Sequence, residues 1–418
     1  MADVFEKLVK DGGPIGQHMK RAHGYFTFPK LEGELGSRMK FRGKDVICWS
    51  LNNYLGLVNH PEVREADTAA AARWGMGYPM GARMMSGNTN LHDELERVIA
   101  PIVKKEDVML LNFGYQGIMS CIDALVNRRD VVVYDAESHA CIVDGIRLHM
   151  GHSYAYKHND VEDCEKQLQR AVRMVEKSGG GILLITEGVF GMAGDQGKLK
   201  EIVALKKKYP FRILIDDAHG FGSMGPNGGG TDEEQGCQAE IDLYFSTFVK
   251  SMGSIGAFIA GPKAVLSYLR YNTRSQIYAK SLPAIIVEGM LKRMEMLKTM
   301  PELKERLWDK VNKLQAGLRK RGFDIGKTNS PVTPIYMKGD VPEATAMVMD
   351  LRENYGIFCS IVVYPVIPRG QIIYRLIPTA AHTDADIEET LEAFTATKQK
   401  LDAGTYKVAE IPDMAEAL

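Results

Sequence analysis

The middle of the chain alternates between short apolar runs and amphipathic stretches. Charged and apolar positions recur with helical spacing over 161–178 and 198–209. Between and beside these stretches lie runs rich in β-branched and aromatic residues: VVVYD (131–135), GILLITEG (181–188), FRILIDD (211–217), IDLYFST (241–247) and GAFIAG (256–261). Strands that alternate with helices favour a mainly parallel sheet with helices on both faces, an α/β fold.

The two flanks have different patterns. Near the N-terminus, MKFRGKDVICWS (39–50) is typical of short strands. A long helical pattern runs from about 285 to 322, and Pro301 should break or kink it. Short strand-like and helical runs follow, which indicates a smaller α+β region. We therefore expect an N-terminal segment (1–60), a large domain (61–285) and a small C-terminal domain (286–418).

Composition narrows the class of protein. The 418 residues are 45% hydrophobic and 25% charged, with a formal net charge of −1, as in ordinary globular proteins. This balance gives no reason to expect binding to nucleic acid or to an anionic membrane. No apolar run is long enough for a transmembrane segment, and the first residues lack a signal-peptide core. Six cysteines without a CxxC pair indicate reduced thiols and a cytoplasmic protein.

Lys250 lies between two apolar runs, 241–249 and 251–261. An unpaired ammonium group in an apolar interior is costly and tends to lose its charge. Either Lys250 marks a turn that reaches solvent, or its amine takes part in chemistry.

Other residues with reactive or ligand-binding side chains also follow the apolar runs. In parallel sheets, ligands bind beyond the carboxyl ends of the strands. The residues found there, or near a helix start, are His139 after 131–135, Asp216, Asp217 and His219 around the end of 211–217, Thr247 and Lys250 after 241–247, Gly114 and Tyr115 in FGYQG, and Arg375 in IIYRLIP.

Pyridoxal phosphate accounts for this set of residues. Its aldehyde needs a lysine amine, and its ring nitrogen needs a carboxylate that keeps it protonated. Its phosphate favours backbone N–H groups at a helix start, together with hydroxyl groups. An amino-acid substrate would need an arginine for its carboxylate.

At these residues the sequence resembles the α-oxoamine synthase family, a branch of the fold-type I pyridoxal-phosphate enzymes. Six motifs occur in the order found in the family: NNYLGL (52–57), SGNTNLHDELE (86–96), SHACIVDG (138–145), DDAHGFG (216–222), TFVKS (247–251) and RLIPTAAHT (375–383). The resemblance implies a large parallel-sheet domain with a smaller α+β domain, and a homodimer whose active site lies at the interface. It also implies condensation of an amino acid with an acyl thioester, carried by coenzyme A or an acyl carrier protein, with loss of CO2.

The resemblance further implies a role for each candidate residue. Lys250 would form the Schiff base with the cofactor and remove the Cα proton, and Asp216 would pair with the ring nitrogen. His139 would stack on the ring and help to orient the substrate, and His219 would hydrogen-bond the ring oxygen. The other implied roles are phosphate binding by the backbone amides of Gly114 and Tyr115 and by the Thr247 hydroxyl, carboxylate binding by Arg375, and a place near the substrate for Asn53. Asn53 has the alternative of simply fixing a turn.

Three positions depart from the family pattern. Val249 precedes the lysine where relatives have a small or hydroxylic residue, and GMAG (191–194) replaces the SMDG of many relatives. Ala279 and Lys280 replace a Ser/Thr pair that relatives present to the phosphate of the neighbouring subunit. We hypothesise that Lys280 reaches across a dimer interface to the phosphate. The alternative is a solvated lysine.

The substrate is less well defined by the sequence. We expect serine and a long-chain acyl thioester first, which would give a sphingoid-like base, with SIVVYPVIP (360–368) lining an acyl path or forming a core strand. Cysteate is an alternative amino-acid substrate if Lys280 adds positive charge near the substrate. Glycine and alanine are further alternatives. Two other classes are an aminotransferase on the same fold and a non-catalytic paralogue that only binds a partner.

Two short motifs suggest other ligands. GFGSMG (220–225) matches a dinucleotide fingerprint, but the following PNGGGTDEEQG predicts a loop where that site needs a helix. His149 and His152 have no Cys or carboxylate partner spaced for a metal site, so we expect no metal.

Overall fold

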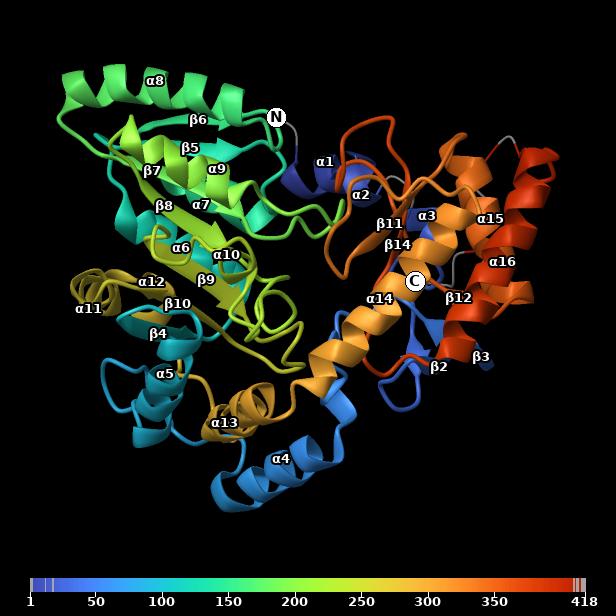
Figure 1. Cartoon of the computed structure of the whole chain (residues 1–418), viewed down its shortest axis with the longest axis horizontal. Coiled ribbons are helices and arrows are strands. Elements are labelled where there is room, and N and C mark those ends of the chain that lie inside the picture. The colour runs from blue at the N-terminus through green and yellow to red at the C-terminus, as the bar shows by residue number, and fades with distance from the viewer. Residues whose placement is uncertain (1–2, 12, 17–18, 409, 411–412, 415–418) are drawn as a thin grey trace. The chain divides into compact units, whose positions relative to one another are not determined.

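The computed structural model describes residues 3–11, 13–16, 19–408, 410 and 413–414 (Figure 1). They form two compact units, a large unit, Asn52–Leu307, and a small unit made of Met1–Leu51 and Trp308–Leu418. The expected boundaries after residues 60 and 285 therefore differ from those of the units. Parts of the expected N-terminal segment and C-terminal domain lie outside the described residues: 1–2, 12, 17–18, 409, 411–412 and 415–418.

The large unit is built on a seven-stranded sheet. Its strands, in spatial order, are β4 (Asp107–Leu111), β10 (Ala257–Gly261), β9 (Leu243–Thr247), β8 (Arg212–Asp216), β7 (Ile182–Glu187), β5 (Val131–Asp135) and β6 (His152–Tyr156). In this sheet β10 runs antiparallel to the other six strands, which are parallel to one another. The mainly parallel sheet predicted from the apolar runs is confirmed, and each of the five predicted runs contains one strand.

Helices cover both faces of this sheet (Figure 1). The helical segments of the large unit are η1 (Leu57–Asn59), α4 (Pro61–Trp74), α5 (Asn90–Ile102), α6 (Gly114–Leu125), α7 (Ala140–Leu148), α8 (Val161–Ser178), α9 (Leu199–Ala204), η2 (Leu205–Lys207), α10 (Thr231–Glu234), α11 (Lys263–Asn272), α12 (Arg274–Ile277) and α13 (Ala284–Thr299). α8 begins with an Asp160 cap that accepts the Asp163 N–H and ends at Gly179 in the left-handed conformation, so its predicted span, 161–178, is matched.

The order in which successive strands are added to the sheet reverses after β6, at one edge of the sheet. From β4 the chain moves through β5 to β6, and then it returns through β7 and β8 to β9. Because parallel crossovers are right-handed, α7 lies on one face and α8 and α9 lie on the other. The carboxyl ends of β5 and β7 therefore flank a topological switch point, which is where ligands bind in such sheets.

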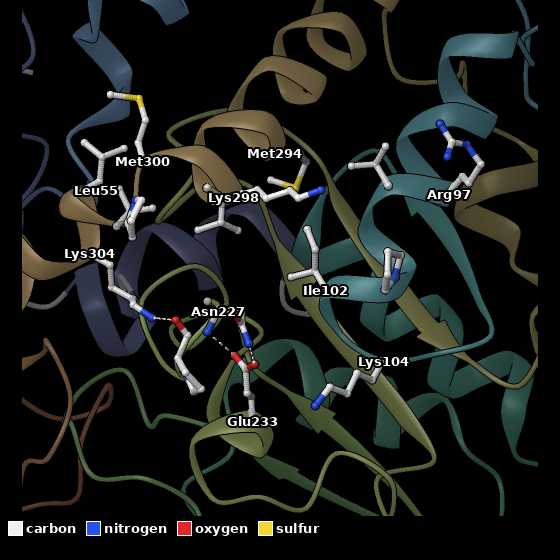
Figure 2. A pocket seen from close by; sticks show the side chains of 17 residues that line it. Leu55, Arg97, Ile102, Lys104, Asn227, Glu233, Met294, Lys298, Met300 and Lys304 are labelled. Atoms are coloured by element: carbon white, nitrogen blue, oxygen red, sulfur yellow. Dashed lines mark hydrogen bonds between the residues drawn. The ribbon is translucent and has the colours of Figure 1, made fainter.

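A cavity of about 470 Å³ lies elsewhere in the large unit (Figure 2). Its lining comes from α5, the end of α13, the turn around Pro301 and the segment 226–228. Figure 2 shows Asn227 hydrogen-bonded to Glu233 at its floor, 2.7 Å from amide to carboxylate. No residue predicted to bind a cofactor or substrate lines this cavity.

The small unit combines both ends of the chain. One sheet contains β1 (Leu31–Glu32), β2 (Arg38–Phe41), β3 (Lys44–Cys48) and β12 (Ile357–Phe358), and the other contains β11 (Thr333–Tyr336), β14 (Ile373–Leu376) and β13 (Ser360–Val362). Its helices are α1 (Val4–Asp11), α2 (Gly13–Gly16), α3 (Met19–Ala22), α15 (Val341–Asn354) and α16 (Asp384–Asp402). The predicted break at Pro301 separates α13 from α14 (Glu302–Lys320), which runs from the large unit into the small one.

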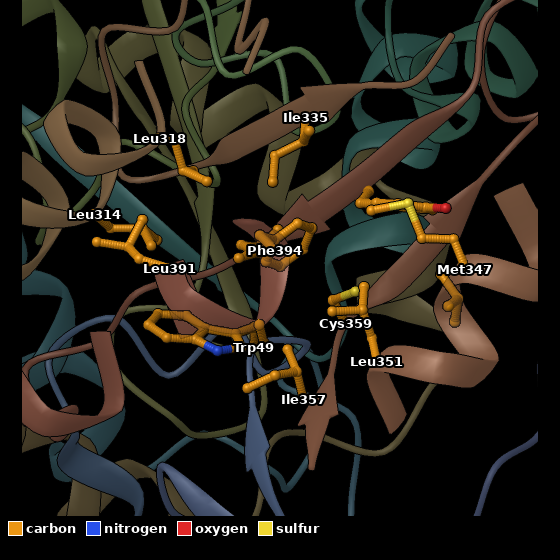
Figure 3. Packing of buried hydrophobic residues seen from close by; sticks show 14 of the residues in the cluster. Trp49, Leu314, Leu318, Ile335, Met347, Leu351, Ile357, Cys359, Leu391 and Phe394 are labelled. Atoms are coloured by element: carbon orange, nitrogen blue, oxygen red, sulfur yellow. The ribbon is translucent and has the colours of Figure 1, made fainter. Parts of the chain in front are cut away.

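The core of the small unit explains why the N-terminal segment belongs to it. Figure 3 shows Trp49 among side chains from the C-terminal part of the chain, including Leu391 and Phe394. The Trp49 indole donates a 2.9 Å hydrogen bond to the Thr390 hydroxyl and stacks on the His382 ring at 4.0 Å. Burial of so large an aromatic side chain outweighs the cost of joining distant parts of the chain.

Two further observations bear on the class of protein. All six cysteines are buried and unpaired, as the sequence predicted for reduced thiols. Among the described residues, no helix combines the length and the apolar character needed to span a bilayer.

Candidate functional site

Three acidic side chains are buried at the carboxyl ends of three adjacent strands. Asp135 ends β5, Glu187 ends β7 and Asp216 ends β8, and Glu187 and Asp216 are paired across the sheet. Their exposed fractions are 0%, 6% and 6%. Buried carboxylates without partners are strongly disfavoured, so this edge of the sheet must supply cations, hydrogen-bond donors or protons.

Asp216 and Asp217 are neighbours, but they have different surroundings. Asp217 accepts hydrogen bonds from the Thr231 N–H (2.6 Å), the Thr231 hydroxyl (2.7 Å) and the Tyr244 hydroxyl (2.9 Å). Asp216 accepts the Ala218 N–H at 3.1 Å, and its Oδ2 lies 4.0 Å from the weakly donating Cys141 thiol. Burial raises the pKa of Asp216, and the Lys250 ammonium opposes that rise. Asp217 is therefore structural, whereas Asp216 retains capacity for a cationic partner.

Lys250 lies in the connection between the antiparallel strands β9 and β10. Phe248 donates its N–H to Gly256 at 2.9 Å, and Gly253 donates its N–H to the Lys250 carbonyl at 3.0 Å. The half-buried Lys250 ammonium lowers the pKa of both Asp216 and Glu187, although burial raises the pKa of each carboxyl overall. The lysine thus lies in a turn, and that turn brings its charge next to the buried acids.

His139 begins α7 at the switch point. Its N–H donates to Glu187 Oε1 at 2.5 Å, and its Nδ1 accepts the Cys141 N–H at 3.3 Å as the cap of the helix. Although part of His139 is exposed, surrounding atoms desolvate its imidazole, and with the Lys250 ammonium they lower its pKa. A neutral aromatic ring with one open side is suited to stacking on a flat ligand.

His219 is fixed by a residue that the sequence analysis did not select. The Tyr54 hydroxyl lies 2.6 Å from His219 Nδ1, and both side chains are buried. On the other side of the ring, a Cβ added at Gly191 would lie 2.4 Å from His219 Nε2. The glycine that replaces the serine of relatives is therefore required by the position of this histidine.

The N-terminus of α6 offers a site for an anion. Phe113 caps the helix without a side-chain hydrogen bond, and the Gly117 N–H makes the first bond back, to the Phe113 carbonyl at 2.9 Å. The preceding N–H groups, including those of Gly114 and Tyr115, therefore have no acceptor within the helix. A Cβ at Gly114 would lie 3.3 Å from Thr247 Oγ1, so this helix start adjoins the end of β9.

Two side-chain hydroxyl groups near the expected phosphate site are bonded within the chain. The Thr247 hydroxyl donates to the Gly256 carbonyl at 2.9 Å, so it has to rotate before it can donate elsewhere. The Tyr115 hydroxyl is bonded to Asp144, which leaves its backbone N–H as the group that faces a ligand.

Asn53, Lys280 and Arg375 are less closely tied to this cluster. Asn53 Oδ1 accepts the Val58 N–H at 3.3 Å, as expected of a residue that fixes a turn. Lys280 is exposed, and its carbonyl accepts a hydrogen bond from the side chain of Asn112, two residues before α6. Arg375 is buried in β14 of the small unit, between Pro334 of β11 and Ser360 of β13.

A second charged cluster supports the loop that carries Gly191. His158 lies 2.9 Å from Asp135 and 3.0 Å from Asp195, through its two ring nitrogens. Burial alone would lower the pKa of His158, but the two carboxylates raise it to about 10. An imidazolium thus neutralises Asp135 and anchors the loop that contains Gly191.

The residues in the large unit fit pyridoxal phosphate. Asp216 is a buried carboxyl that can accept a further hydrogen bond from a protonated ring nitrogen, and the N–H groups at the start of α6, which have no acceptor within the helix, suit a phosphate. Lys250, Asp216, His139 and the start of α6 all lie around the carboxyl edge of one sheet. Glu187, Cys141 and Tyr54 belong to the same cluster, and the sequence analysis missed their contacts. In the described part of the chain, no three His, Cys, Asp or Glu side chains are gathered to hold a metal ion.

Comparison with known proteins agrees with this geometry. The model of the aminotransferase class I and II family matches residues 44–394. The cysteate-C-fatty acyltransferase of Capnocytophaga ochracea is 62% identical over 407 residues, 97% of each chain. The 8-amino-7-oxononanoate synthase of Thermoanaerobacter pseudethanolicus is 35% identical over 92% of this chain and 96% of its own. The serine palmitoyltransferase of Bacteroides ovatus is 35% identical over 95% of this chain and 98% of its own.

Solved structures are similar over nearly the whole length as well. A high-resolution structure of serine palmitoyltransferase with its pyridoxal-phosphate internal aldimine has a TM-score of 0.86 and 29% identity, covering 96% of this chain and 100% of that one. The serine palmitoyltransferase of Sphingomonas wittichii has a TM-score of 0.87 and 28% identity, covering 97% and 100%.

Replacement of Gly191 tests the packing around His219. A Gly191→Ser side chain would push the His219 ring away from Tyr54, and such overpacking costs about 1–3 kcal/mol. We expect the dissociation constant for pyridoxal phosphate, measured by equilibrium dialysis, to rise at least about fivefold. Ala193→Ser adds the same hydroxyl to the same loop and serves as the control. Unchanged cofactor affinity in Gly191→Ser would contradict the packing argument.

Proposed function

We infer the reaction from one premise: the chain belongs to the α-oxoamine synthases, a branch of the class I and II aminotransferase family, and is a C-acyltransferase that uses pyridoxal 5'-phosphate. From this premise we propose that it joins cysteate to a long-chain fatty acyl group, carried as a thioester. The new bond connects Cα of the amino acid to the acyl carbonyl carbon. The C–S bond breaks to release the thiol, and the amino-acid carboxyl group leaves as CO2. The product is an α-amino ketone that carries a sulfonate.

One observation supports cysteate as the amino-acid substrate. The relative named for cysteate is 62% identical over 97% of both chains, whereas the relatives named for serine are 33–35% identical. Substrate pockets diverge faster than folds, so the much higher identity supports the same amino acid here. Serine, which the sequence pattern favoured first, becomes the alternative.

Lys280 supplies a physical reason for this choice. Cysteate carries one more negative charge than serine, and a neighbouring cation would favour it. The lysine replaces a hydroxyl residue of relatives, its side chain is exposed, and its backbone adjoins Asn112 near the phosphate-binding start of α6. We propose that its ammonium group interacts with the phosphate or the sulfonate, within the chain or across a dimer interface.

The other residues would act as follows. Lys250 would hold the cofactor through its amine and accept the proton from Cα of the amino acid. Asp216 would keep the ring nitrogen protonated, and His139 would lie against the ring. The bound cofactor supplies an electron sink that stabilises negative charge at Cα.

The remaining contacts would orient the reactants. His219, held by Tyr54, would donate to the ring oxygen, and the N–H groups of Gly114 and Tyr115, with the Thr247 hydroxyl, would bind the phosphate. Arg375 is proposed to bind the substrate carboxylate by a charge-assisted pair, and Asn53 is proposed near the same substrate. We also propose a cytoplasmic homodimer with its active site at the interface, and coenzyme A or an acyl carrier protein as acyl donor.

A substrate panel tests the proposed reaction. Purified protein with pyridoxal phosphate is offered cysteate, serine, glycine or alanine, each with a long-chain acyl-coenzyme A, and thiol release and CO2 are measured. We expect cysteate to give a kcat/KM at least about tenfold above that of serine. Higher kcat/KM with serine would refute the cysteate assignment. Conversion of the cofactor to its pyridoxamine form by the amino acid alone, without thiol release, would identify an aminotransferase instead.

Lys280→Met tests the source of this selectivity. Loss of the ammonium should lower kcat/KM for cysteate by about tenfold while that for serine changes less than about twofold. Lys263→Met, which removes an exposed lysine at the start of α11, is the matched control. Equal losses for cysteate and serine, together with weaker cofactor binding, would assign Lys280 to the phosphate. No loss with either amino acid, and unchanged cofactor affinity, would remove it from the site.

A further inference from the structure

Glu187 joins the two sides of the switch point. It is the last residue of β7, and its Oε1 accepts the His139 N–H at 2.5 Å, a short bond. His139 follows β5 and opens α7, on the face opposite the connection that leaves β7. This hydrogen bond therefore ties the start of α7 to the neighbouring strand across the crevice in which ligands bind in such sheets.

The orientation of the His139 ring depends on that backbone position. The ring makes an edge contact with Tyr115, with centroids 6.2 Å apart, and its Nδ1 faces its own helix, 3.3 Å from the Cys141 N–H and 2.9 Å from the Cys141 sulfur. Because Cys141 belongs to the same helix start as His139, the direction of the ring follows the backbone position of that helix start. The acceptor that fixes the backbone N–H is Glu187, so displacement of Glu187 would turn the imidazole.

The charge of Glu187 matters because of its neighbours. Asp216 is its partner across the parallel pair, and Asp135 ends the strand on the other side. Burial, and then the charge of Asp216, raise the pKa of Glu187 well above its ordinary value. A protonated carboxyl group still accepts a hydrogen bond through its carbonyl oxygen, and it adds no second negative charge beside Asp216.

We propose that Glu187 is a positioning residue, a hydrogen-bond acceptor that holds the backbone of His139 and thereby sets the imidazole against the cofactor ring. This proposal rests on the proposed function only in taking His139 as the residue that stacks on pyridoxal phosphate. It does not depend on which amino acid is the substrate. A merely structural role would stabilise the strand end without acting through His139.

Two substitutions separate the acceptor from the charge. Glu187→Gln keeps a carbonyl oxygen and has no charge, whereas Glu187→Met keeps the length and has no acceptor. In the holoenzyme we expect Glu187→Gln to bind pyridoxal phosphate within about twofold of wild type, and Glu187→Met to bind it at least about tenfold more weakly. Glu137→Met is the matched control, because Glu137 is a nearby carboxylate that makes no hydrogen bond to His139 among those found in the described residues.

A double-mutant cycle tests whether the effect passes through His139. In a His139→Ala background, Glu187→Met should weaken cofactor binding by less than about twofold further, because the ring that it positions is gone. Effects that multiply instead would overturn the proposal. So would wild-type affinity in Glu187→Met, or a loss in Glu187→Gln as large as that in Glu187→Met.

Folding is checked by thermal unfolding of each variant. If Glu187→Met does not fold, Glu187→Gln decides: wild-type cofactor affinity together with an unchanged His139 imidazole signal in NMR supports the proposal, and a change in either overturns it. Cofactor binding is measured without amino acid or thioester. Failure of the cysteate assay would therefore refute the proposed function and leave this result intact.

Discussion

Asp135, Glu187 and Asp216 are buried next to one another where three parallel strands end, and ionised together they would repel one another strongly. Each is accommodated differently. Asp135 is paired with the His158 imidazolium, burial and the charge of Asp216 raise the pKa of Glu187, and Asp216 lies near the Lys250 ammonium. A cationic cofactor ring would give Asp216 a further cationic partner, so the arrangement suits a ligand with a protonated ring nitrogen.

The same arrangement links sheet topology to chemistry. Right-handed crossovers send the chain to opposite faces after β5 and β7, so the topological switch point lies between these strands, where the His139 N–H is bonded to Glu187. The β9–β10 turn carries Lys250 to the same edge, and the uncapped start of α6 adjoins Thr247 there. Lys250 lies between two apolar runs because those runs form the antiparallel strands β9 and β10, and the turn between them lies at the carboxyl edge of the sheet.

Many of the strands and helices could be predicted from the local pattern of apolar and polar residues. The strand 131–135 and the helix 161–178 were predicted because apolar periodicity and caps depend on neighbouring residues. The inclusion of Trp49 in the core of the small unit was not predicted, because its partners lie more than 260 residues away along the chain. Glu187 was missed because it ends an apolar run and gains its role only when β7 lies between β5 and β8. The sequence also could not show that Thr231 and Tyr244 engage Asp217 rather than Asp216.

The central claim is that the Lys250 amine is the covalent attachment point for pyridoxal phosphate beside a buried acid. The most direct test is borohydride reduction of the holo-protein, followed by proteolysis and mass spectrometry of the peptides. The account predicts a stable cofactor adduct on the peptide that contains Lys250, and loss of that adduct in Lys250→Ala. An unmodified Lys250, or an adduct on another lysine of the wild-type protein, would contradict it.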